Sequence, residues 1–314
     1  MGLKARDLVC SVIVTYNPKM DLLQGVISAA LKQCGLTVIY DNSPKIDSYN
    51  SIEYLIETLQ YHKTIEIGEA VSYHSDQNSG LPKAYNWAAN LAEQKGYKFL
   101  LILDQDSLLS NNTVNTLVAA YDMISQSAMV GALSAANVEE TGQTDDFLLG
   151  FYKKAGFESM DGIREIFFAW NSGMMVPLKT INDISGFNES YFLDCADLDF
   201  CFRIHEDKKR IFQLREAIIT HELHQLEEVN LFGIHMKLRL LQPFRFYYLG
   251  RDGLKIARDH YEGHPKLVLF ILLMICHDIM HFVLFSRGRQ KLNGVYFFSK
   301  GIVDYFRKRT GEVQ

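Results

Sequence analysis

Two carboxylates one residue apart follow a short apolar run. Residues 99–103 are Phe-Leu-Leu-Ile-Leu, and Asp104, Gln105, Asp106 and Ser107 come directly after them. A buried strand that ends in this way brings two like charges to one sheet edge, where they repel each other and lose hydration. A divalent cation would offset both effects, because Mg²⁺ and Mn²⁺ prefer oxygen ligands and keep substrate phosphates in their shell. A strand-ending turn with an aspartate helix cap is the alternative that this segment leaves open.

Segments of strand and helix character alternate before this carboxylate pair. Apolar runs favour buried strands, and the segments between them have helical spacing or an alanine-rich composition. The expected strands are 9–14, 37–40, 71–74 and 99–103, and the expected helices are 20–34, 51–61 and 82–95. The alternation predicts an α/β fold with a mostly parallel sheet flanked by helices.

Polar residues follow each expected strand. Ligands of such sheets bind outside the carboxyl ends of the strands. That rule places a row of polar residues on one rim, namely Thr15, Tyr16, Asp41, Asn78, Gly80, Asp104 and Asp106. No G-x-G-x-x-G motif follows the first strand, which argues against a dinucleotide-binding Rossmann domain.

Four motifs in order carry a family resemblance. They are S-V-I-V-T-Y-N, Y-D-N-S, N-S-G-L-P-K-A-Y-N and L-D-Q-D-S. Over roughly residues 8–250 the chain resembles family 2 of the inverting, GT-A-fold glycosyltransferases. The Asp-Gln-Asp-Ser form is most like the bacterial rhamnosyltransferase-like branch. The resemblance implies a GT-A fold, a Rossmann-like nucleotide-diphospho-sugar transferase sheet, with a helical C-terminal extension.

The resemblance implies a nucleotide site at the first strands. Thr15, Tyr16 and Asn17 would line the nucleotide pocket. Asp41 would accept a hydrogen bond from N3–H of a uracil or thymine ring. A turn-capping role is the alternative for Asp41.

The third and fourth motifs, together with His221, would form the part of the site that binds the ribose and the metal. Asn78 and Gly80 would form the loop near the base and ribose, unless they make a plain strand-to-helix turn. Asp104 would bind either the metal or the ribose. Asp106 and His221 would complete a Mn²⁺ or Mg²⁺ site. The alternative for His221 is that it only makes hydrogen bonds near the pocket and binds no metal.

The acidic segment near residue 197 departs from the family pattern. The family has Glu-Asp-x-Asp here, but this chain has Ala196 in place of the Glu. The rhamnosyl branch often has Asp-x-x-Asp, which Asp194 and Asp197 preserve. The resemblance therefore makes Asp197 the catalytic base, supported by Asp194. A solvated helix start, with acids favoured by the helix dipole, is the alternative.

Three further residues are candidates for the acceptor side. Trp170 would offer an aromatic face to a sugar ring, or it is a core residue. Arg245 and Arg251 would contact diphosphate or lipid phosphate, because one guanidinium group can donate hydrogen bonds to two phosphate oxygens at once. Surface salt bridges are the alternative for both arginines.

The C-terminal quarter differs from the rest in charge. Residues 237–314 hold 14 Lys and Arg against 6 Asp and Glu, although the whole chain has a net charge of −5. The basic part contains no nucleic-acid module, so no nucleic acid partner is expected. Residues 266–285 are apolar but contain His277, Asp278 and His281. These features favour an interfacial helix pair over a spanning helix, with a packed core or dimer face also open.

The expected organisation is a catalytic domain over 1–235 and a helical extension over 236–314. The five cysteines form no C-x-x-C pair, and the N-terminus does not read as a signal peptide. We therefore expect a cytoplasmic protein, peripheral to the inner face of the plasma membrane.

The leading functional hypothesis is an inverting transferase. It would move L-rhamnose from dTDP-L-rhamnose onto a growing cell-surface polysaccharide or a lipid-linked oligosaccharide. Galactosyl or galactofuranosyl transfer from a UDP-sugar is the rival within the class. A nucleotidyltransferase would need a glycine- and Lys/Arg-rich loop after the first strand, which Thr15-Tyr16-Asn17-Pro18 is not. A non-catalytic sugar-binding module is the remaining alternative.

Overall fold

The computed structural model divides the chain into two compact units. It describes residues 4–61, 67–139, 159–160, 162–221, 227–231, 234–238, 241–286 and 288–313. The first unit comprises residues 1–187 and 200–222, and the second comprises 188–199 and 223–314. The sequence prediction placed the boundary after residue 235 and did not assign 188–199 to the C-terminal part.

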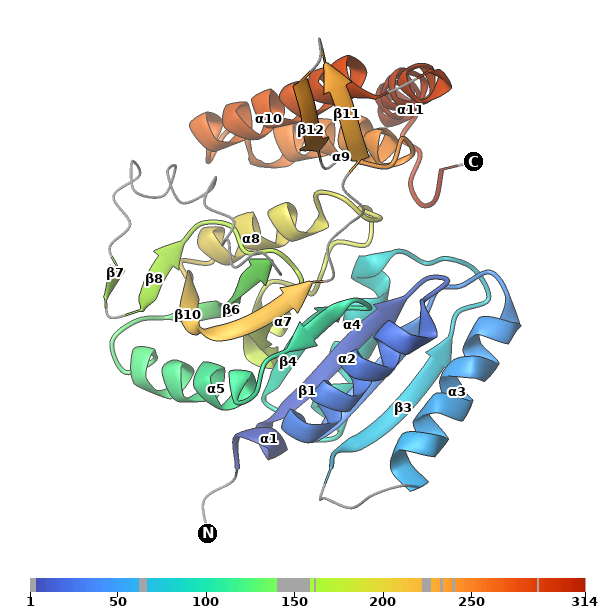
Figure 1. Cartoon of the computed structure of the whole chain (residues 1–314). Helices are drawn as coiled ribbons and strands as arrows, with labels where there is room; N and C mark the ends of the chain where they lie inside the picture. The colour runs from blue at the N-terminus through green and yellow to red at the C-terminus, as the bar shows by residue number, and fades with distance from the viewer. Residues whose placement is uncertain are drawn as a thin grey trace. The chain divides into compact units, whose positions relative to one another are not determined.

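The first unit alternates strands and helices along the chain as far as β4 (Figure 1). Its elements are α1 (Ala5–Leu8), β1 (Val9–Thr15), α2 (Met20–Gln33), β2 (Leu36–Asp41), α3 (Ile46–Tyr61), β3 (Glu69–His74), α4 (Leu81–Gln94), β4 (Phe99–Asp104), β5 (Ser107–Leu109), α5 (Thr113–Ile124), β6 (Val130–Glu139), β7 (Ser159–Met160), β8 (Ile163–Ile166), β9 (Met174–Pro177), α7 (Leu178–Asp183), part of α8 (Ala196–Glu206) and β10 (Arg210–His221).

The strands β3, β2, β1 and β4 are neighbours in that order and run parallel. Thr15 lies opposite Asp41, and Asp41 lies opposite His74. Val14 lies opposite Asp104 on the other side of β1. The carboxyl ends of four strands therefore form one edge, which confirms the strand–helix alternation predicted from the sequence.

The sheet continues past β4 into a mixed half, in the order β9-β6-β10-β8-β7. Strand β9 is antiparallel to both β4 and β6, whereas β6 and β10 are parallel. Strand β5 pairs antiparallel with the end of β10. Antiparallel neighbours need no helical crossover, so the regular strand–helix alternation of the first half stops here.

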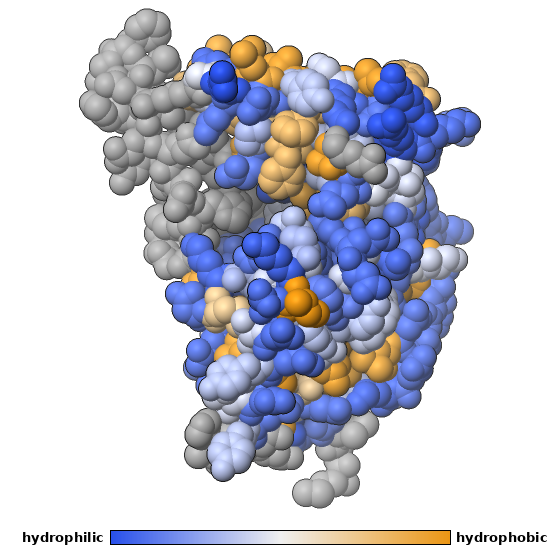
Figure 2. All heavy atoms as spheres, turned by 90° about the vertical axis from the view of Figure 1, so that its right-hand side faces the viewer, coloured by the Kyte–Doolittle hydropathy of each residue, from blue (hydrophilic) through white to orange (hydrophobic). Residues whose placement is uncertain are grey.

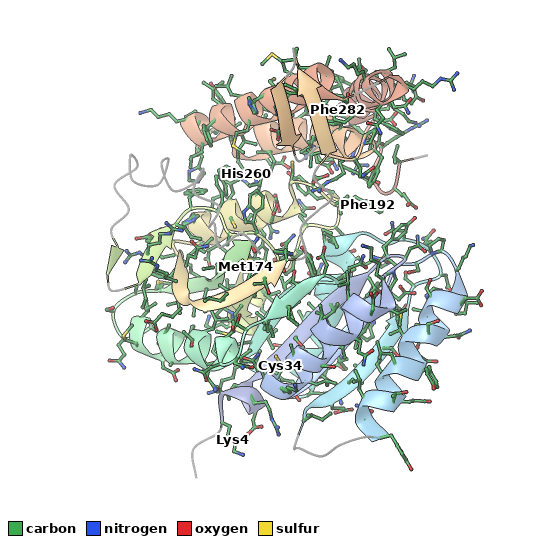
Figure 3. All side chains as sticks on the ribbon, viewed as in Figure 1. Lys4, Cys34, Met174, Phe192, His260 and Phe282 are labelled. Carbon is green, nitrogen blue, oxygen red and sulfur yellow. The ribbon has the colours of Figure 1, made fainter. Side chains whose placement is uncertain are left out.

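Helices cover both faces of the parallel half. Helices α2, α3 and α5 contribute to one apolar core, while α4 lies on the opposite face (Figure 1). The buried alanines Ala84, Ala88 and Ala92 let α4 lie close to the strands. All five cysteines are free, and every one except Cys276 is buried. Figure 3 labels Cys34 and Met174 in this unit.

The second unit contains a two-stranded antiparallel ribbon and three long helices. Its elements are β11 (Glu227–Leu231), β12 (Ile234–Leu238), α9 (Arg245–His260), α10 (Pro265–Phe285) and α11 (Arg289–Phe306). Helices α9 and α11 approach so closely that a Cβ at Gly301 would lie 2.1 Å from the carbonyl oxygen of Tyr247. This is the helical extension expected from the sequence.

The segment 188–199 packs into this helical unit. Phe192 stacks on Tyr248, with ring centroids 5.2 Å apart. His260 Nε2, at the end of α9, lies 3.0 Å from Asp199 Oδ1, and both side chains are buried. Figure 3 labels Phe192 and His260 in this unit. These contacts fix the first turn of α8, which carries Asp197.

Candidate active site

The carboxylate pair lies in the turn between β4 and β5. Asp104 is the last residue of β4, Gln105 and Asp106 form the turn, and Ser107 begins β5. Because β5 pairs with the end of β10, His221 lies directly opposite Ser107. Strand pairing thus brings a histidine from far along the chain to the two carboxylates.

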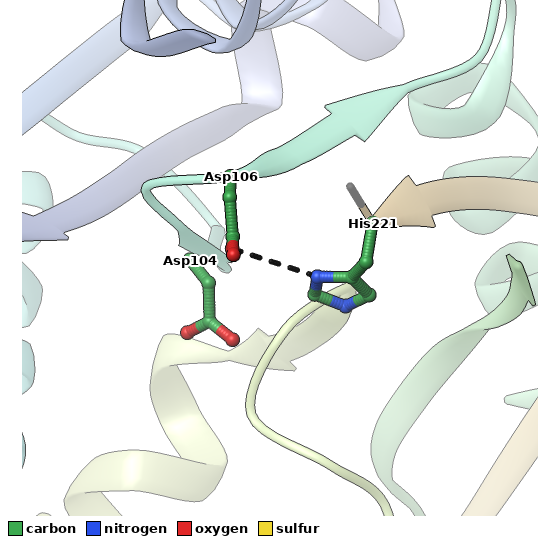
Figure 4. A group of neighbouring side chains, drawn as sticks. All are labelled: Asp104, Asp106 and His221. Carbon is green, nitrogen blue, oxygen red and sulfur yellow. Dashed lines mark ion pairs between the residues drawn. The ribbon is translucent and has the colours of Figure 1, made fainter. Parts of the chain in front are cut away.

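Asp104, Asp106 and His221 form a cluster that could hold a metal ion (Figure 4). One ligand atom from each lies within 4.8 Å of the others, and all three residues are partly buried. Nδ1 of His221 lies 3.6 Å from Oδ1 of Asp106. Two carboxylate oxygens and an imidazole nitrogen are donors that suit Mn²⁺ or Mg²⁺. The donor set therefore fits the predicted metal.

Two serine hydroxyls support this cluster. Ser107 Oγ lies 2.9 Å from Nδ1 of His221. Ser172 Oγ donates to Ser107 Oγ at 2.6 Å and accepts a hydrogen bond from the backbone N–H of Asp104 at 3.2 Å. Ser172 is not among the residues predicted from the sequence, because a lone serine in a loop gives no signal of such a contact. The hydroxyls orient the imidazole and the turn, as groups behind metal ligands commonly do.

Gly173 places Ser172. Its φ is +80°, a conformation that side-chain-bearing residues rarely adopt. A Cβ there would lie 2.9 Å from Ile219 Cδ1 and 3.1 Å from Ala135 Cβ. The Gly173 N–H donates to Ile102 and its carbonyl accepts from Ala135. The turn is therefore clamped between β4 and β6.

The predicted nucleotide residues lie at the ends of β1 and β2. Thr15 and Asp41 are fully buried, and Thr15 Oγ1 donates to Asp41 Oδ1 at 2.7 Å. Tyr16 is 45% exposed, and its backbone N–H donates to Gln105 Oε1 at 2.9 Å. Asn17 has a φ of +46°, and its N–H donates to Ser43 Oγ. The end of β1 is thus tied to the turn that carries the carboxylate pair.

Asn78 and Gly80 form the turn into α4. Gly80 precedes the helix with a φ of +79°, and its N–H donates to Asn78 Oδ1 at 3.2 Å. Asn42 Oδ1 accepts from the N–H and Oγ of Ser79, which ties this turn to the end of β2. Pro82 lies in the first turn of α4, where its missing N–H costs no helical hydrogen bond.

In the second unit, Asp197 has an unusual environment. It lies in the first turn of α8, and burial raises its pKa to about 7. The Asp194 carboxylate also raises this pKa, whereas the Leu198 N–H and the Arg245 guanidinium lower it. Arg245 pairs with Asp194. A carboxyl that titrates near neutral pH suits a general base.

The structure contradicts the phosphate-binding role predicted for Arg251. Its side chain is completely buried, and its Nε and Nη2 donate to Asp252 while Nη1 donates to the Gly311 carbonyl. The guanidinium also lies over the rings of Tyr247 and Tyr248. Arg251 is therefore an interior ion-pair residue rather than a phosphate ligand.

Trp170, in the first unit, is 46% exposed, so its ring has a free surface. This exposure makes a core role, the alternative considered from the sequence, a poor fit. Stacking on a sugar ring remains a prediction.

Comparison with known proteins adds one sequence relative. No family model matches the chain. The chain is 21% identical over 309 residues to the dTDP-rhamnosyl transferase RfbF of Shigella flexneri, with 96% of this chain and 97% of the relative covered.

Three solved structures are similar to the chain. The mannosyltransferase PcManGT from Pyrobaculum calidifontis, in complex with GDP-Man and Mn²⁺, has a TM-score of 0.57 at 13% identity, over 96% of this chain and 87% of that one. TarS 1–349 from S. aureus has a TM-score of 0.53 at 16% identity, over 94% and 80%.

GalNAc-T7 with UDP, GalNAc and Mn²⁺ has a TM-score of 0.53 at 12% identity, over 82% of this chain. The chain spans about half of that protein, 52% of its length. These likenesses show the fold, and it is the GT-A fold expected from the sequence.

Proposed function

We propose that this chain with the GT-A fold is an inverting glycosyltransferase that uses a nucleotide-sugar donor. The observation that carries the proposal is the group formed by Asp104, Asp106 and His221 at the carboxyl edge of the sheet. Ligands of open α/β sheets bind at this edge. The fold supports the same class, because the similar structures include proteins in complex with UDP or GDP-Man and Mn²⁺.

The first unit would bind the donor through its diphosphate. Asp104, Asp106 and His221 would hold Mn²⁺ or Mg²⁺, which supplies positive charge to the oxygens of the leaving diphosphate. Ser107 and Ser172 would keep the histidine and the Asp104 backbone in place. The bond from the anomeric carbon to the diphosphate oxygen breaks as the acceptor oxygen bonds to that carbon.

Asp197 is the proposed proton acceptor. Asp197 would take the proton from the acceptor hydroxyl, so that a single displacement inverts the anomeric centre. A pKa of about 7 leaves a substantial fraction of this carboxyl ionised at neutral pH and still basic enough to accept a proton. Arg245 would hold Asp194 beside it.

The donor we favour is dTDP-L-rhamnose, because the similar protein RfbF is described as a dTDP-rhamnosyl transferase. The acceptor would be a growing cell-surface polysaccharide or a lipid-linked oligosaccharide. A thermal-shift and turnover screen of dTDP-L-rhamnose, UDP-galactose and GDP-mannose, each with Mn²⁺ or EDTA, tests this. We expect the dTDP-sugar with Mn²⁺ to give the largest shift and to release dTDP when acceptor is present.

Other outcomes of the screen have defined meanings. A preference for the UDP-sugar would move the proposal to galactosyl or galactofuranosyl transfer. If the nucleotide sugar binds equally well with Mn²⁺ and with EDTA, the proposed metal site is wrong. The Asp106→Asn variant should behave as the wild type does in EDTA, and the exposed-residue variant Lys98→Gln is its control.

An exposed apolar face on the helical unit suggests that the enzyme binds its acceptor at a membrane surface. By its length and composition, helix α10 is long and apolar enough to cross a membrane, yet only 22% of its most apolar 18-residue window is buried. Figure 2 shows hydrophobic atoms gathered along the upper edge of the view, where Figure 1 places α10 and α11. We define the apolar face by its exposed side chains Leu269, Leu273, Met280 and Leu284 on α10 and Leu292, Val295, Tyr296, Val303 and Phe306 on α11.

Positive charge lies at both ends of α11. Arg289 and Lys291 begin α11, and residues 307–309, Arg-Lys-Arg, follow its end. An apolar face with basic ends matches the acyl and anionic headgroup layers of a bilayer surface. Asp278 within α10 disfavours a spanning orientation. We infer that this face binds the inner surface of the plasma membrane, and that the protein is peripheral and cytoplasmic.

Vesicle sedimentation tests this inference. Wild-type protein should sediment with vesicles that contain anionic phosphatidylglycerol and much less with neutral phosphatidylcholine. The double variant Leu273→Glu, Met280→Glu should stay in solution, while Tyr54→Glu on the first unit should sediment like the wild type. A concentration-dependent dimer that the same double variant dissociates, without vesicle binding by the wild type, would show a dimer face instead.

A further inference from the structure

The carboxylate of Asp41 is enclosed by its neighbours. Its side chain has no exposed surface. Oδ1 accepts hydrogen bonds from Thr15 Oγ1 at 2.7 Å, from Ser43 Oγ at 2.6 Å and from the Ser43 N–H at 3.2 Å. Oδ2 lies 2.9 Å from His74 Nδ1. A ligand could reach this carboxylate only by displacing one of these partners.

His74 is the member of the pair that a ligand can reach. Its side chain is 17% exposed, against none for Asp41. Thr15, Asp41 and His74 lie opposite one another at the ends of β1, β2 and β3. The three side chains therefore form a hydrogen-bonded row along the carboxyl edge of the sheet, with the histidine at its outer end.

The pairing with Asp41 sets the chemistry of the imidazole. A carboxylate only accepts, so the proton of a neutral His74 resides on Nδ1 and leaves Nε2 with a lone pair. A lone pair of this kind accepts the N3–H of uracil or thymine. Cytosine carries no hydrogen on N3, so it has nothing to donate there.

The row also lies at a suitable distance from the metal cluster. Strands β3, β2, β1 and β4 are adjacent, so three strand spacings, about 14 Å, separate the ends of β3 and β4. An extended nucleoside diphosphate spans roughly this length from its base to a metal on its phosphates. Between them, Tyr16 is exposed and anchored through its N–H to Gln105, which offers an aromatic surface at the same edge.

We propose that His74, oriented by Asp41, accepts the hydrogen bond from N3–H of a uracil or thymine ring and so selects the donor nucleotide. The proposal rests on the proposed function, because it concerns the nucleotide of the same site. Asp41 then acts on the base through His74 rather than by direct contact, which revises the role that the family resemblance implied for it.

A thermodynamic cycle, which combines one change in the ligand with one substitution in the protein, isolates the free energy of this hydrogen bond. The affinities of UDP and of N3-methyl-UDP are measured by calorimetry with Mn²⁺ for the wild type and for His74→Ala. Methylation removes the ligand's donor, and the substitution removes the protein's acceptor. We expect methylation alone, or His74→Ala alone, to weaken binding roughly five- to tenfold. The methylated ligand should bind His74→Ala about as tightly as UDP does, because the hydrogen bond is already lost.

Controls separate the possible failures. CDP affinity should be equal in wild type and His74→Ala, and Tyr54→Ala, an exposed ring of the same unit, should bind UDP normally. His74→Gln, which restores an acceptor, should recover part of the lost affinity. If His74→Ala binds UDP as the wild type does and still discriminates against the methylated ligand, the assignment of His74 is overturned. If the wild type binds no nucleoside diphosphate, the proposed function itself fails.

Discussion

Ser107 Oγ lies 2.9 Å from Nδ1 of His221, although 114 positions separate the two residues in the chain. The contact follows from the antiparallel pairing of β5 with the end of β10, which sets His221 opposite Ser107. Ser172 donates to the same hydroxyl from the turn before β9. The histidine of the proposed metal site is thus held by groups from two other segments of the first unit.

Removing the Ser107 hydroxyl should weaken metal binding. We expect Ser107→Ala to lower Mn²⁺ affinity by about 10- to 100-fold, the usual effect of losing a group that orients a metal ligand. Calorimetric titration with Mn²⁺ in the presence of a nucleoside diphosphate measures this. The exposed residue Ser125 supplies the control, Ser125→Ala, which should bind like the wild type. An unchanged affinity in Ser107→Ala would mean that the hydroxyl does not orient His221.

Adding one methyl group at Gly173 should disturb the same cluster. Gly173→Ala has to adopt a φ of +80° and also meets Ile219 at 2.9 Å, so we expect a loss of about 2–4 kcal/mol of stability. Gly96→Ala is a matched control, because Gly96 has a φ of +81° but nothing within 4 Å of the added carbon. Chemical denaturation should show a loss of only about 1–2 kcal/mol for the control, and only Gly173→Ala should also lower Mn²⁺ affinity.

The proposed base predicts the pH dependence of turnover. Asp197 can accept a proton only when it is ionised, and its pKa is raised to about 7. The rate should therefore rise with pH through about 7 and level off above it. Asp197→Asn should lose about 10²- to 10⁴-fold in rate at every pH. A rate that stays constant from pH 5 to 8 would exclude this carboxyl as the base.

Two neighbours should shift this profile in opposite directions. Arg245 lowers the pKa of Asp197, so Arg245→Gln should move the midpoint of the rate profile to higher pH. Asp194 raises it, so Asp194→Asn should move the midpoint to lower pH. Initial rates across the pH range measure both shifts, with the exposed-residue variant Lys98→Gln as the control. Shifts of the same sign in both variants would contradict the electrostatic account.

Stability should respond to Asp197 as well. Its pKa is about 7 in the folded protein against an ordinary 3.8, so ionising it favours the unfolded chain. The penalty is absent below about pH 4, grows as the pH rises toward 7 and is constant above it. Asp197→Asn should therefore raise the melting temperature at pH 8 and leave it unchanged at pH 4. Thermal unfolding at both values, compared with Lys98→Gln, tests the sign.

The parallel half of the fold and its rim were predictable from the sequence. Apolar runs of strand length, broken by turns such as Thr15-Tyr16-Asn17-Pro18, mark β1, β2 and β4, because buried parallel strands need continuous apolar residues. The edge strand β3 has no buried residue and carries a weaker pattern. The meeting of His221 with Asp104 and Asp106 was expected only through the family resemblance, because strand pairing over such a separation leaves no local pattern.

Other features had no local signal at all. The hydroxyl of Ser172 reaches Ser107 and the Asp104 N–H only because Gly173 turns the chain back between two strands. The enclosure of Asp41 depends on Ser43 and His74, one of them on another strand. Arg251 resembled a phosphate ligand by residue type, and only its burial beside Asp252 revealed the ion pair. Each of these depends on which segments fold together, and composition and periodicity do not record that.

The pairing of β5 with β10 has a consequence for how the protein is made. The carboxylates are synthesised early, but their histidine partner is residue 221, at the end of the last strand of the first unit. A nascent chain on the ribosome therefore cannot complete the proposed metal site until β10 has emerged and paired. Mn²⁺ would stabilise only chains that have passed this point, so metal supply during translation would favour finished sheets over arrested intermediates.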